Sequence, residues 1–305
     1  MNNRKYLIVV TGPTAIGKTA LAIALAKHYT TVIISADSRQ CYREMRIGTA
    51  VPDDSELAEV PHHFMQHRSV AEPYSTGDFE REAITKLHAL FKKHDIVIMA
   101  GGSGLYIDAI LKGLDDFPEV DPEIREQLNT RLRKEGIEAL QEQLRKADPG
   151  YFKQADIHNP RRLIRALEIC IATGKPYSSF LGEKKVSREF IPLLIGITAD
   201  RETVYDRINR RVERMMKQGF LEEAQQLYPH RNENALQTVG YKELFHYLEG
   251  KYSLKEAVSE IKKNTRRYAK RQLTWLRGKE NLIRVQLPVK IEAVIREIDQ
   301  HIRKG

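Results

Sequence analysis

The sequence predicts an α/β protein with a parallel sheet, into which a helical segment is inserted. Three observations predict it. Apolar, strand-like runs at residues 6–10, 31–35 and 95–100 alternate with helical patterns, which is typical of βαβ units. A glycine-rich segment directly follows the first of these runs. Charged helical segments at residues 116–199 then separate two parts of the chain that have the composition of a folded core.

The glycine-rich segment has the spacing G-x-x-x-x-G-K-T and precedes a helical pattern at residues 20–28. Its glycines let backbone N–H groups approach phosphate oxygens at a helix N-terminus, while a lysine and a hydroxyl reach the same group and its metal. We therefore expect a P-loop core like that of nucleotide kinases, and a diphosphate or triphosphate as substrate. The residues expected to bind phosphate are Gly12, Pro13, Thr14, Ala15, Ile16, Gly17, Lys18 and Thr19.

The next two strands bring polar side chains to the same edge of the sheet. The second apolar run ends before Asp37, and the third ends before Ser103. Because the carboxyl ends of parallel strands line the ligand crevice, we expect both side chains beside the phosphate loop. A carboxylate at this place either holds Mg²⁺ or takes a proton from an incoming nucleophile. Between these strands, residues 79–93 have helical spacing and residues 59–76 read as a loop.

A change of character near residue 115 predicts the domain boundaries. We expect the α/β core to comprise residues 1–115 and 200–305, and the helical insertion to comprise residues 116–199. Within the insertion, helices are expected at residues 122–134 and 160–173.

Core composition returns with a strand expected at residues 190–197, where Pro192 argues against a fully central position at its start. The last third of the chain is mainly helical in pattern. Its expected helices are residues 201–218, 221–227 and 254–277.

The net charge of +9 comes entirely from the last third. Residues 1–200 contain 27 basic and 27 acidic side chains, whereas residues 201–305 contain 23 and 14. Such a basic region suits a polyanion larger than a nucleotide, with nucleic acid as the obvious class. It could also flank a diphosphate or be an ordinary solvated face. One face of the last predicted helix carries Lys263, Arg266, Arg267, Lys270, Thr274 and Arg277.

Bulk properties point to a cytoplasmic protein without a membrane partner. No apolar run approaches the roughly 18 residues of a membrane span. The charged N-terminus leads directly into a core strand and has no signal-peptide pattern. Cys41 and Cys170 lie far apart, which argues against a disulfide framework. His62, His63 and His67 have no Cys or paired carboxylate at ligand spacing, so we expect loop packing there instead of zinc.

Seven blocks, in order along the chain, resemble bacterial tRNA dimethylallyltransferases. The phosphate loop is the first of them, and Gly101-Gly102-Ser103-Gly104 belongs to the fourth. Four positions depart from the family's usual pattern. Ser103 occupies a position where threonine is usual, and Arg39, Glu44 and Val51 replace the expected methionine, glycine and lysine. The blocks are residues 12–19, 34–42, 47–50, 101–106, 159–168, 239–241 and 270–277.

The resemblance implies transfer of a dimethylallyl group from dimethylallyl diphosphate to the exocyclic amine of the adenosine just 3′ of the anticodon. It implies Mg²⁺ near Thr19, Asp37 as general base and Ser103 as a second catalytic group. Arg207 and Arg211 would support the diphosphate, although one of them could serve only in a salt bridge. We expect a monomer whose partner is the anticodon stem-loop of tRNA.

The resemblance also implies which residues contact the tRNA. The role of Arg125 is assigned only from its position in the chain relative to the family, and this arginine could be only a surface charge. The implied contacts are Asp37, Ser38, Arg39, Gln40, Ser103, Arg125, Arg162, Leu163, Ile164, Arg165 and Ala166.

Three alternatives remain from the residues. A prenyltransferase acting on free adenylate would share the crevice chemistry but would not need the insertion. A P-loop kinase with ATP as donor would leave the long basic helix without a role. A non-catalytic RNA-binding protein switched by nucleotide would not need Asp37 and Ser103 at the phosphate site.

Overall fold

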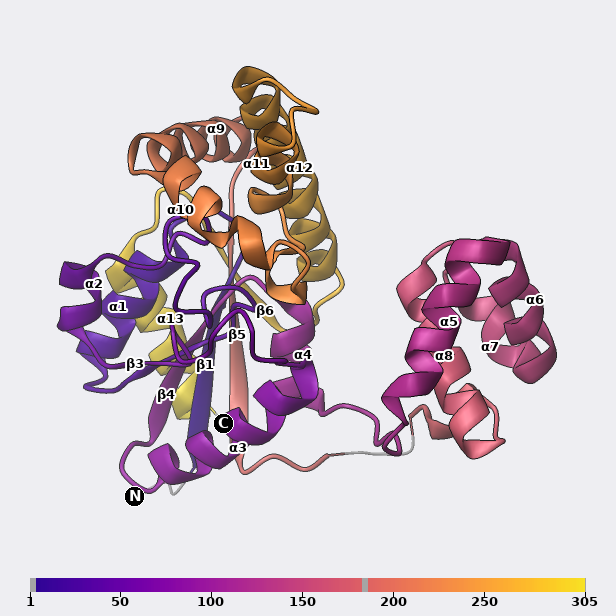
Figure 1. The fold of residues 1–305 in the computed structure, drawn as a ribbon. Helices are drawn as coiled ribbons and strands as arrows, with labels where there is room; N and C mark the ends of the chain where they lie inside the picture. The colour runs from indigo at the N-terminus through magenta and orange to yellow at the C-terminus, as the bar shows by residue number, and fades with distance from the viewer. Residues whose placement is uncertain (1–3, 183–185, 305) are drawn as a thin grey trace. The chain divides into compact units, whose positions relative to one another are not determined.

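The computed structural model describes residues 4–182 and 186–304 (Figure 1). The chain divides into two compact units. The first combines Met1–Leu111 with Arg188–Gly305, and the second is Lys112–Ser187.

A parallel six-stranded sheet forms the centre of the first unit, which confirms the predicted fold class. The second unit ends at Ser187 instead of residue 199, because the strand that follows it pairs with β1 from Phe190 to Gly196. At the start of that strand Pro192 pairs with Leu7, whereas β6 joins only from Leu194 onward. In spatial order the strands are β3 (His62–His63), β2 (Ile33–Ser35), β4 (Ile96–Ala100), β1 (Lys5–Thr11), β5 (Phe190–Thr198) and β6 (Leu282–Gln286).

Helices cover both faces of the sheet because the strand side chains alternate. Leu7 and Val9 of β1 pack in one core cluster, and Ile8 and Val10 pack in the other. The first cluster includes residues of α3 (Thr76–Phe91) and α4 (Gly104–Lys112), and the second includes residues of α1 (Lys18–His28) and α13 (Ile291–Lys304). A short helix, α2 (Asp54–Glu59), comes directly before the loop predicted at residues 59–76, and the two-residue strand β3 lies within that loop.

A group of helices lies beyond the carboxyl end of the sheet (Figure 1). They pack on one another through α9·α12, α10·α11 and α11·α12 contacts. These helices are α9 (Arg201–Lys217), α10 (Phe220–Leu227), α11 (Tyr241–Leu248) and α12 (Leu254–Arg277), with 3₁₀ turns at Tyr228–His230 and Asn234–Leu236.

The second unit is a small helical domain with its own core. Leu128, Leu140, Leu144 and Leu167 are buried in it. Gly136, with φ of 83°, joins the first two helices in a turn that favours glycine. Its helices are α5 (Pro122–Glu135), α6 (Ile137–Ala147), α7 (Pro149–Gln154) and α8 (Pro160–Thr173), followed by a 3₁₀ turn at Tyr177–Phe180.

Candidate functional site

The phosphate loop lies between β1 and α1, as predicted, and its backbone contains three residues with positive φ. These are Gly12 (150°), Ala15 (65°) and Gly17 (103°). A Cβ on Gly12 would lie 2.6 Å from the carbonyl oxygen of Ile197 in β5, so only glycine fits at this position. The backbone of the phosphate loop at Gly12 therefore lies too close to the backbone of β5 for any side chain to fit between them.

The lysine of this loop is held by the loop's own carbonyl groups. The ammonium of Lys18 donates hydrogen bonds to the carbonyl oxygens of Gly12 at 3.1 Å and Pro13 at 2.9 Å. Burial of the ammonium, and then the positive charge of Arg211, lower the pKa of Lys18 to about 8, while Asp37 opposes the shift. An anionic ligand would supply the negative charge that this site lacks.

Both predicted arginines reach the phosphate loop from α9. The Nε of Arg207 donates to the carbonyl oxygen of Ala15 at 2.7 Å. The Nη1 of Arg211 donates to the hydroxyl of Thr14 at 3.3 Å, and burial lowers the pKa of Arg211. Together with Lys18 they form a cluster of cations around the loop, which suits a diphosphate.

The carboxylate of Asp37 lies just after β2. Its Oδ1 accepts the backbone N–H of Arg39 at 2.9 Å and that of Gln40 at 3.4 Å, which is the geometry of an Asx turn. The same side chain lines a cavity of about 960 Å³ together with Lys18 and Thr19. Because both hydrogen bonds use Oδ1, Oδ2 is free of the turn and can accept a proton.

Ser103 lies in the glycine-rich turn after β4 and is buried. Its hydroxyl oxygen accepts the backbone N–H of Ser38 at 3.0 Å. A glycine is required two residues before Ser103, because a Cβ on Gly101 would lie 2.2 Å from the carbonyl oxygen of Ala36. The structure therefore brings the predicted base and the predicted hydroxyl to one edge of the sheet.

Gln272 of α12 was not among the predicted site residues. Its Oε1 accepts the backbone N–H of Thr14 at 2.8 Å, and its Nε2 donates to the carbonyl oxygen of Gly102 at 2.9 Å. One buried amide thus joins the phosphate loop to the turn that carries Ser103. Its place in the seventh sequence block was the only signal that could have found it.

A second cavity, of about 690 Å³, adjoins the first. Both are lined by Thr14, Asp37, Arg211 and Tyr268. Burial and then the charge of Asp37 raise the pKa of Tyr268 to about 12, opposed by a hydrogen bond to Ser103. Asp37 therefore lies where two compartments meet, and the larger one contains the phosphate loop.

The side chains of Arg39 and Gln40, close to Asp37, donate hydrogen bonds to backbone carbonyl oxygens. The Nη1 of Arg39 donates to the carbonyl oxygens of Asn234 and Ala235, both at 3.0 Å. The Nε2 of Gln40 donates to the carbonyl oxygens of residues 49 and 50, at 3.2 and 2.9 Å. These contacts fix the loop after β2, and a contact of either residue with tRNA stays a prediction.

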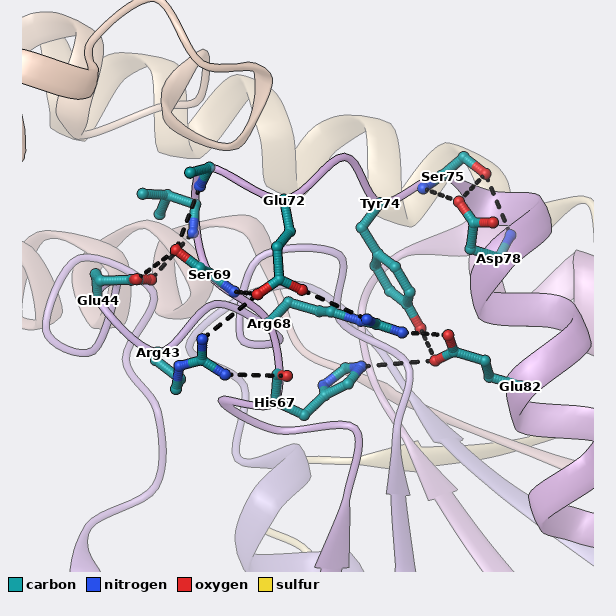
Figure 2. Close-up of polar contacts among 12 residues, drawn as sticks. Arg43, Glu44, His67, Arg68, Ser69, Glu72, Tyr74, Ser75, Asp78 and Glu82 are labelled. Carbon is teal, nitrogen blue, oxygen red and sulfur yellow. Dashed lines mark hydrogen bonds and ion pairs between the residues drawn. The ribbon is translucent and has the colours of Figure 1, made fainter.

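A polar network joins the loop after β2 to residues 67–72 and to α3 (Figure 2). Glu44 accepts the hydroxyl of Ser69 at 2.7 Å and the backbone N–H of the following residue at 3.1 Å. Arg68 forms ion pairs with Glu72 and Glu82. The charge of Arg68 is therefore paired both with Glu72 of the same segment and with Glu82 of α3.

Of the three histidines, His62 and His63 form β3 and pair with β2, and His67 lies in the loop that follows. The Nδ1 of His62 contacts the carbonyl oxygen of Val60 at 2.9 Å. His67 makes edge contacts with the rings of Phe64 and Tyr74, and burial lowers its pKa. No group of three or more His, Cys, Asp or Glu side chains in residues 4–182 and 186–304 could hold a metal ion.

The basic face of α12 is only partly free. Lys263 pairs with Glu260, and Arg266 donates to the Oδ1 of Asn209 at 2.9 Å. Lys270, Thr274 and Arg277 are exposed. The exposed part of this face lies towards the C-terminal end of the helix.

In the second unit, Arg125 is paired. Its Nη2 donates to Oε2 of Glu168 at 2.8 Å, its Nε contacts the other carboxylate oxygen, and Glu168 is 1% exposed. Arg162 is exposed at the start of α8, and the guanidinium of Arg165 lies 5.1 Å from the ring centre of Phe117. Three predicted tRNA contacts within α8 have buried side chains, and their contact with tRNA stays a prediction: Leu163, Ile164 and Ala166.

The family model described as IPP transferase matches residues 40–279. A tRNA dimethylallyltransferase of Christiangramia forsetii is 62% identical over 272 residues, which cover 89% of this chain and 90% of that protein. One of Flavobacterium johnsoniae is 56% identical over 283 residues, covering 91% and 92%.

Solved structures agree with these sequence relatives. The crystal structure of a full-length tRNA isopentenylpyrophosphate transferase from Bacillus halodurans is 37% identical, with a TM-score of 0.71, and the match covers 99% of this chain and 96% of that one. A eukaryotic dimethylallyltransferase acting on tRNA is 28% identical, with a TM-score of 0.76, over 92% of this chain and 74% of that one. This chain belongs to the IPP transferase family.

Proposed function

We propose that this chain is a tRNA dimethylallyltransferase. It transfers the dimethylallyl group from dimethylallyl diphosphate to the exocyclic amine of the adenosine just 3′ of the anticodon, giving N6-isopentenyladenosine. The observation that supports this most directly is the position of Asp37, which lines both cavities. One cavity contains the phosphate loop with Lys18, and the other offers room for an acceptor base that has left the anticodon stack.

The chemistry requires a base and a site for the leaving group. The adenine amine is a poor nucleophile because its lone pair is delocalised into the ring, so its proton must be removed as the new C–N bond forms. Oδ2 of Asp37 accepts that proton. The bond between the allylic carbon and the diphosphate oxygen breaks, and the negative charge of the departing diphosphate is stabilised by loop amides, Lys18, Arg207 and Arg211.

Mg²⁺ fits this site as an ion carried by the diphosphate. A hard cation prefers oxygen ligands, and the hydroxyl of Thr19 lines the same cavity as Lys18 and Asp37. Thr19 and the diphosphate oxygens would hold the ion, which supplies positive charge to the leaving group.

The tRNA would be bound by both units. Ser38 and Arg39 line the smaller cavity and Gln40 lines the larger one. The exposed side chain of Arg162 at the start of α8 offers positive charge to phosphates. Arg125 stabilises α8, which carries Arg162, through its ion pair with Glu168 of the same helix. The exposed end of the basic face of α12 adds to the electrostatic attraction of the polyanion.

The test incubates the purified chain with Mg²⁺ and radiolabelled dimethylallyl diphosphate, together with unmodified tRNA or, separately, free adenylate. Label in tRNA alone is the expected result. Label in adenylate alone would assign the chain to the nucleotide prenyltransferases. No label in either acceptor would overturn the proposal and make phosphoryl transfer from ATP the next reaction to assay.

A further inference from the structure

Glu223 of α10 accepts four hydrogen bonds at the loop after β2. Its Oε2 accepts the backbone N–H groups of Arg46 at 3.0 Å and Ile47 at 2.7 Å. Its Oε1 accepts the N–H of Gly48 at 2.8 Å and the hydroxyl of Tyr241 at 2.6 Å. Three consecutive amides that converge on one carboxylate form an anion cradle, which here is filled by the protein's own side chain.

The packing around this cradle depends on a glycine. A Cβ on Gly48 would lie 2.2 Å from the ring of Phe220 and 2.5 Å from the hydroxyl of Tyr241. The two rings meet edge to face, 5.1 Å apart, and both are fully buried. Burial and then the charge of Glu223 raise the pKa of Tyr241 well above its usual value, so its hydroxyl remains a donor.

The loop that Glu223 holds forms walls of both reaction cavities. Gly48 and Thr49 line the smaller cavity, and Ile47 and Thr49 line the larger one. Movement of this loop would therefore change the space on both sides of Asp37.

A chain of hydrogen bonds leads from the cradle to the base. Gln40 donates to the carbonyl oxygens of Thr49 and Ala50, and its own backbone N–H donates to Asp37. The amides held by Glu223 directly precede Thr49 in the sequence. The carboxylate is thus connected to the Asx turn of Asp37 without touching either cavity's expected ligands.

We propose that Glu223 is a positioning residue for the transfer reaction, which holds the loop at residues 46–49 and thereby the orientation of Asp37. The role of Asp37 rests on the proposed function. The anchoring of the loop does not, and it can be measured without any substrate.

The first experiment compares hydrogen exchange in Glu223→Gln and Glu222→Gln. Glu222 is exposed in the same first turn of α10, so both changes remove the same charge from the same helix N-terminus. Glutamine replaces one of the two accepting oxygens by an NH2 group, which cannot accept from an N–H. At least one loop amide is therefore left unpaired. We expect the amides of Ile47 and Gly48 to exchange about tenfold faster or more in Glu223→Gln alone. Equal exchange in the two variants would overturn the proposal.

The second experiment measures kinetics of the same pair. For Glu223→Gln we expect kcat to fall about tenfold or more, with KM for dimethylallyl diphosphate changed less than about twofold, because the loop moves while the phosphate site stays intact. Tyr241→Phe keeps the three amide contacts of Glu223, so its kcat should fall much less than that of Glu223→Gln. A kcat that falls only with the folded fraction, or does not fall, contradicts a positioning role. If neither the unaltered chain nor Glu222→Gln transfers the group to any acceptor, the proposed function fails while the exchange result still stands.

Discussion

The hydroxyl oxygen of Ser103 accepts the backbone N–H of Ser38 at 3.0 Å, and the same hydroxyl donates to the side chain of Ser38 at 3.2 Å. The turn after β4 is therefore tied to the residue next to Asp37. Because neighbouring strands β2 and β4 deliver these residues, the contact is a direct product of the sheet order. A change in Ser103 should act on the same step as a change in Asp37.

Ser103→Ala should lower kcat about tenfold, because the N–H of Ser38 loses its acceptor and the turn loses its tie to the base. Ser103→Thr keeps the hydroxyl and should retain most of the activity. Initial rates at saturating dimethylallyl diphosphate and tRNA measure both variants. Equal losses in the two would indicate that side-chain size, and not the hydroxyl, is what matters.

Asp37→Asn should lower the rate of transfer by about 10²–10⁴, since the amide still accepts the hydrogen bonds of the Asx turn but cannot take a proton. Asp37→Ala should be inactive as well, and both should bind dimethylallyl diphosphate nearly as well as the unaltered chain. Single-turnover rates and calorimetric binding separate the two quantities. Equal loss of binding and transfer would contradict the role of Asp37 as base.

Lys18 should make ligand binding and stability depend on pH. Its pKa in the ligand-free chain is about 8, below the usual 10.5, so the unfolded chain binds this proton more tightly. The lowered pKa of Lys18 destabilises the folded chain fully below pH 8, and the free energy of unfolding should rise with pH between about 8 and 10.5.

A bound diphosphate raises the pKa of Lys18 again, so binding at pH 8 should take up about half a proton. Calorimetry in two buffers of different ionisation enthalpy measures this uptake, which Lys18→Met should abolish. A binding enthalpy independent of buffer would refute the prediction.

Gln272→Leu should reduce the free energy of unfolding by about 2–4 kcal/mol, because it leaves the N–H of Thr14 and the carbonyl oxygen of Gly102 without partners in a buried place. It should also weaken diphosphate binding, since the phosphate loop loses its tie to α12. Urea unfolding and calorimetric titration check the two effects. Leu273, next to it in the sequence, provides a control: Leu273→Met keeps the volume and should change stability by less than about 1.5 kcal/mol.

The fold was predictable where the pattern is local. The strand, glycine-rich loop and helix from Lys5 to His28 follow from apolar periodicity and glycine spacing alone. The strand β6 and the helix α2 were not predicted. The first is five residues long and is defined by its pairing with β5, and the second buries no side chain. Only the capping box of Asp53 and Glu56 could have indicated α2.

The site was predictable as far as strand ends determine it. Asp37 and Ser103 follow apolar strands, and parallel topology brings them together. Gln272 and Glu223 act through hydrogen bonds to backbone groups far away in the sequence, so no local pattern describes their partners. In the sequence, Glu223 looks like any acidic residue that favours a helix N-terminus.

Arg125→Met should destabilise the helical unit. The change leaves the buried carboxylate of Glu168 with only Arg165, whose Nη1 lies 3.4 Å away. Uncompensated buried charge is costly, but the side chain of Arg125 is itself more than half exposed, so we expect a loss of about 2 kcal/mol, below the range for fully buried pairs. Urea unfolding followed by circular dichroism measures it.

Arg162→Ala is the matched change, because Arg162 is exposed on the same helix α8 as Glu168. It should leave stability within about 0.5 kcal/mol and weaken tRNA binding, with the salt dependence of log K reduced by about one. KM for dimethylallyl diphosphate should not change, since the phosphate loop belongs to the other unit. The two arginines would then differ in kind, one supporting the RNA surface through Glu168 and the other meeting phosphate directly. The opposite pattern, with Arg162 needed for stability and Arg125 for the salt dependence, would reverse these assignments.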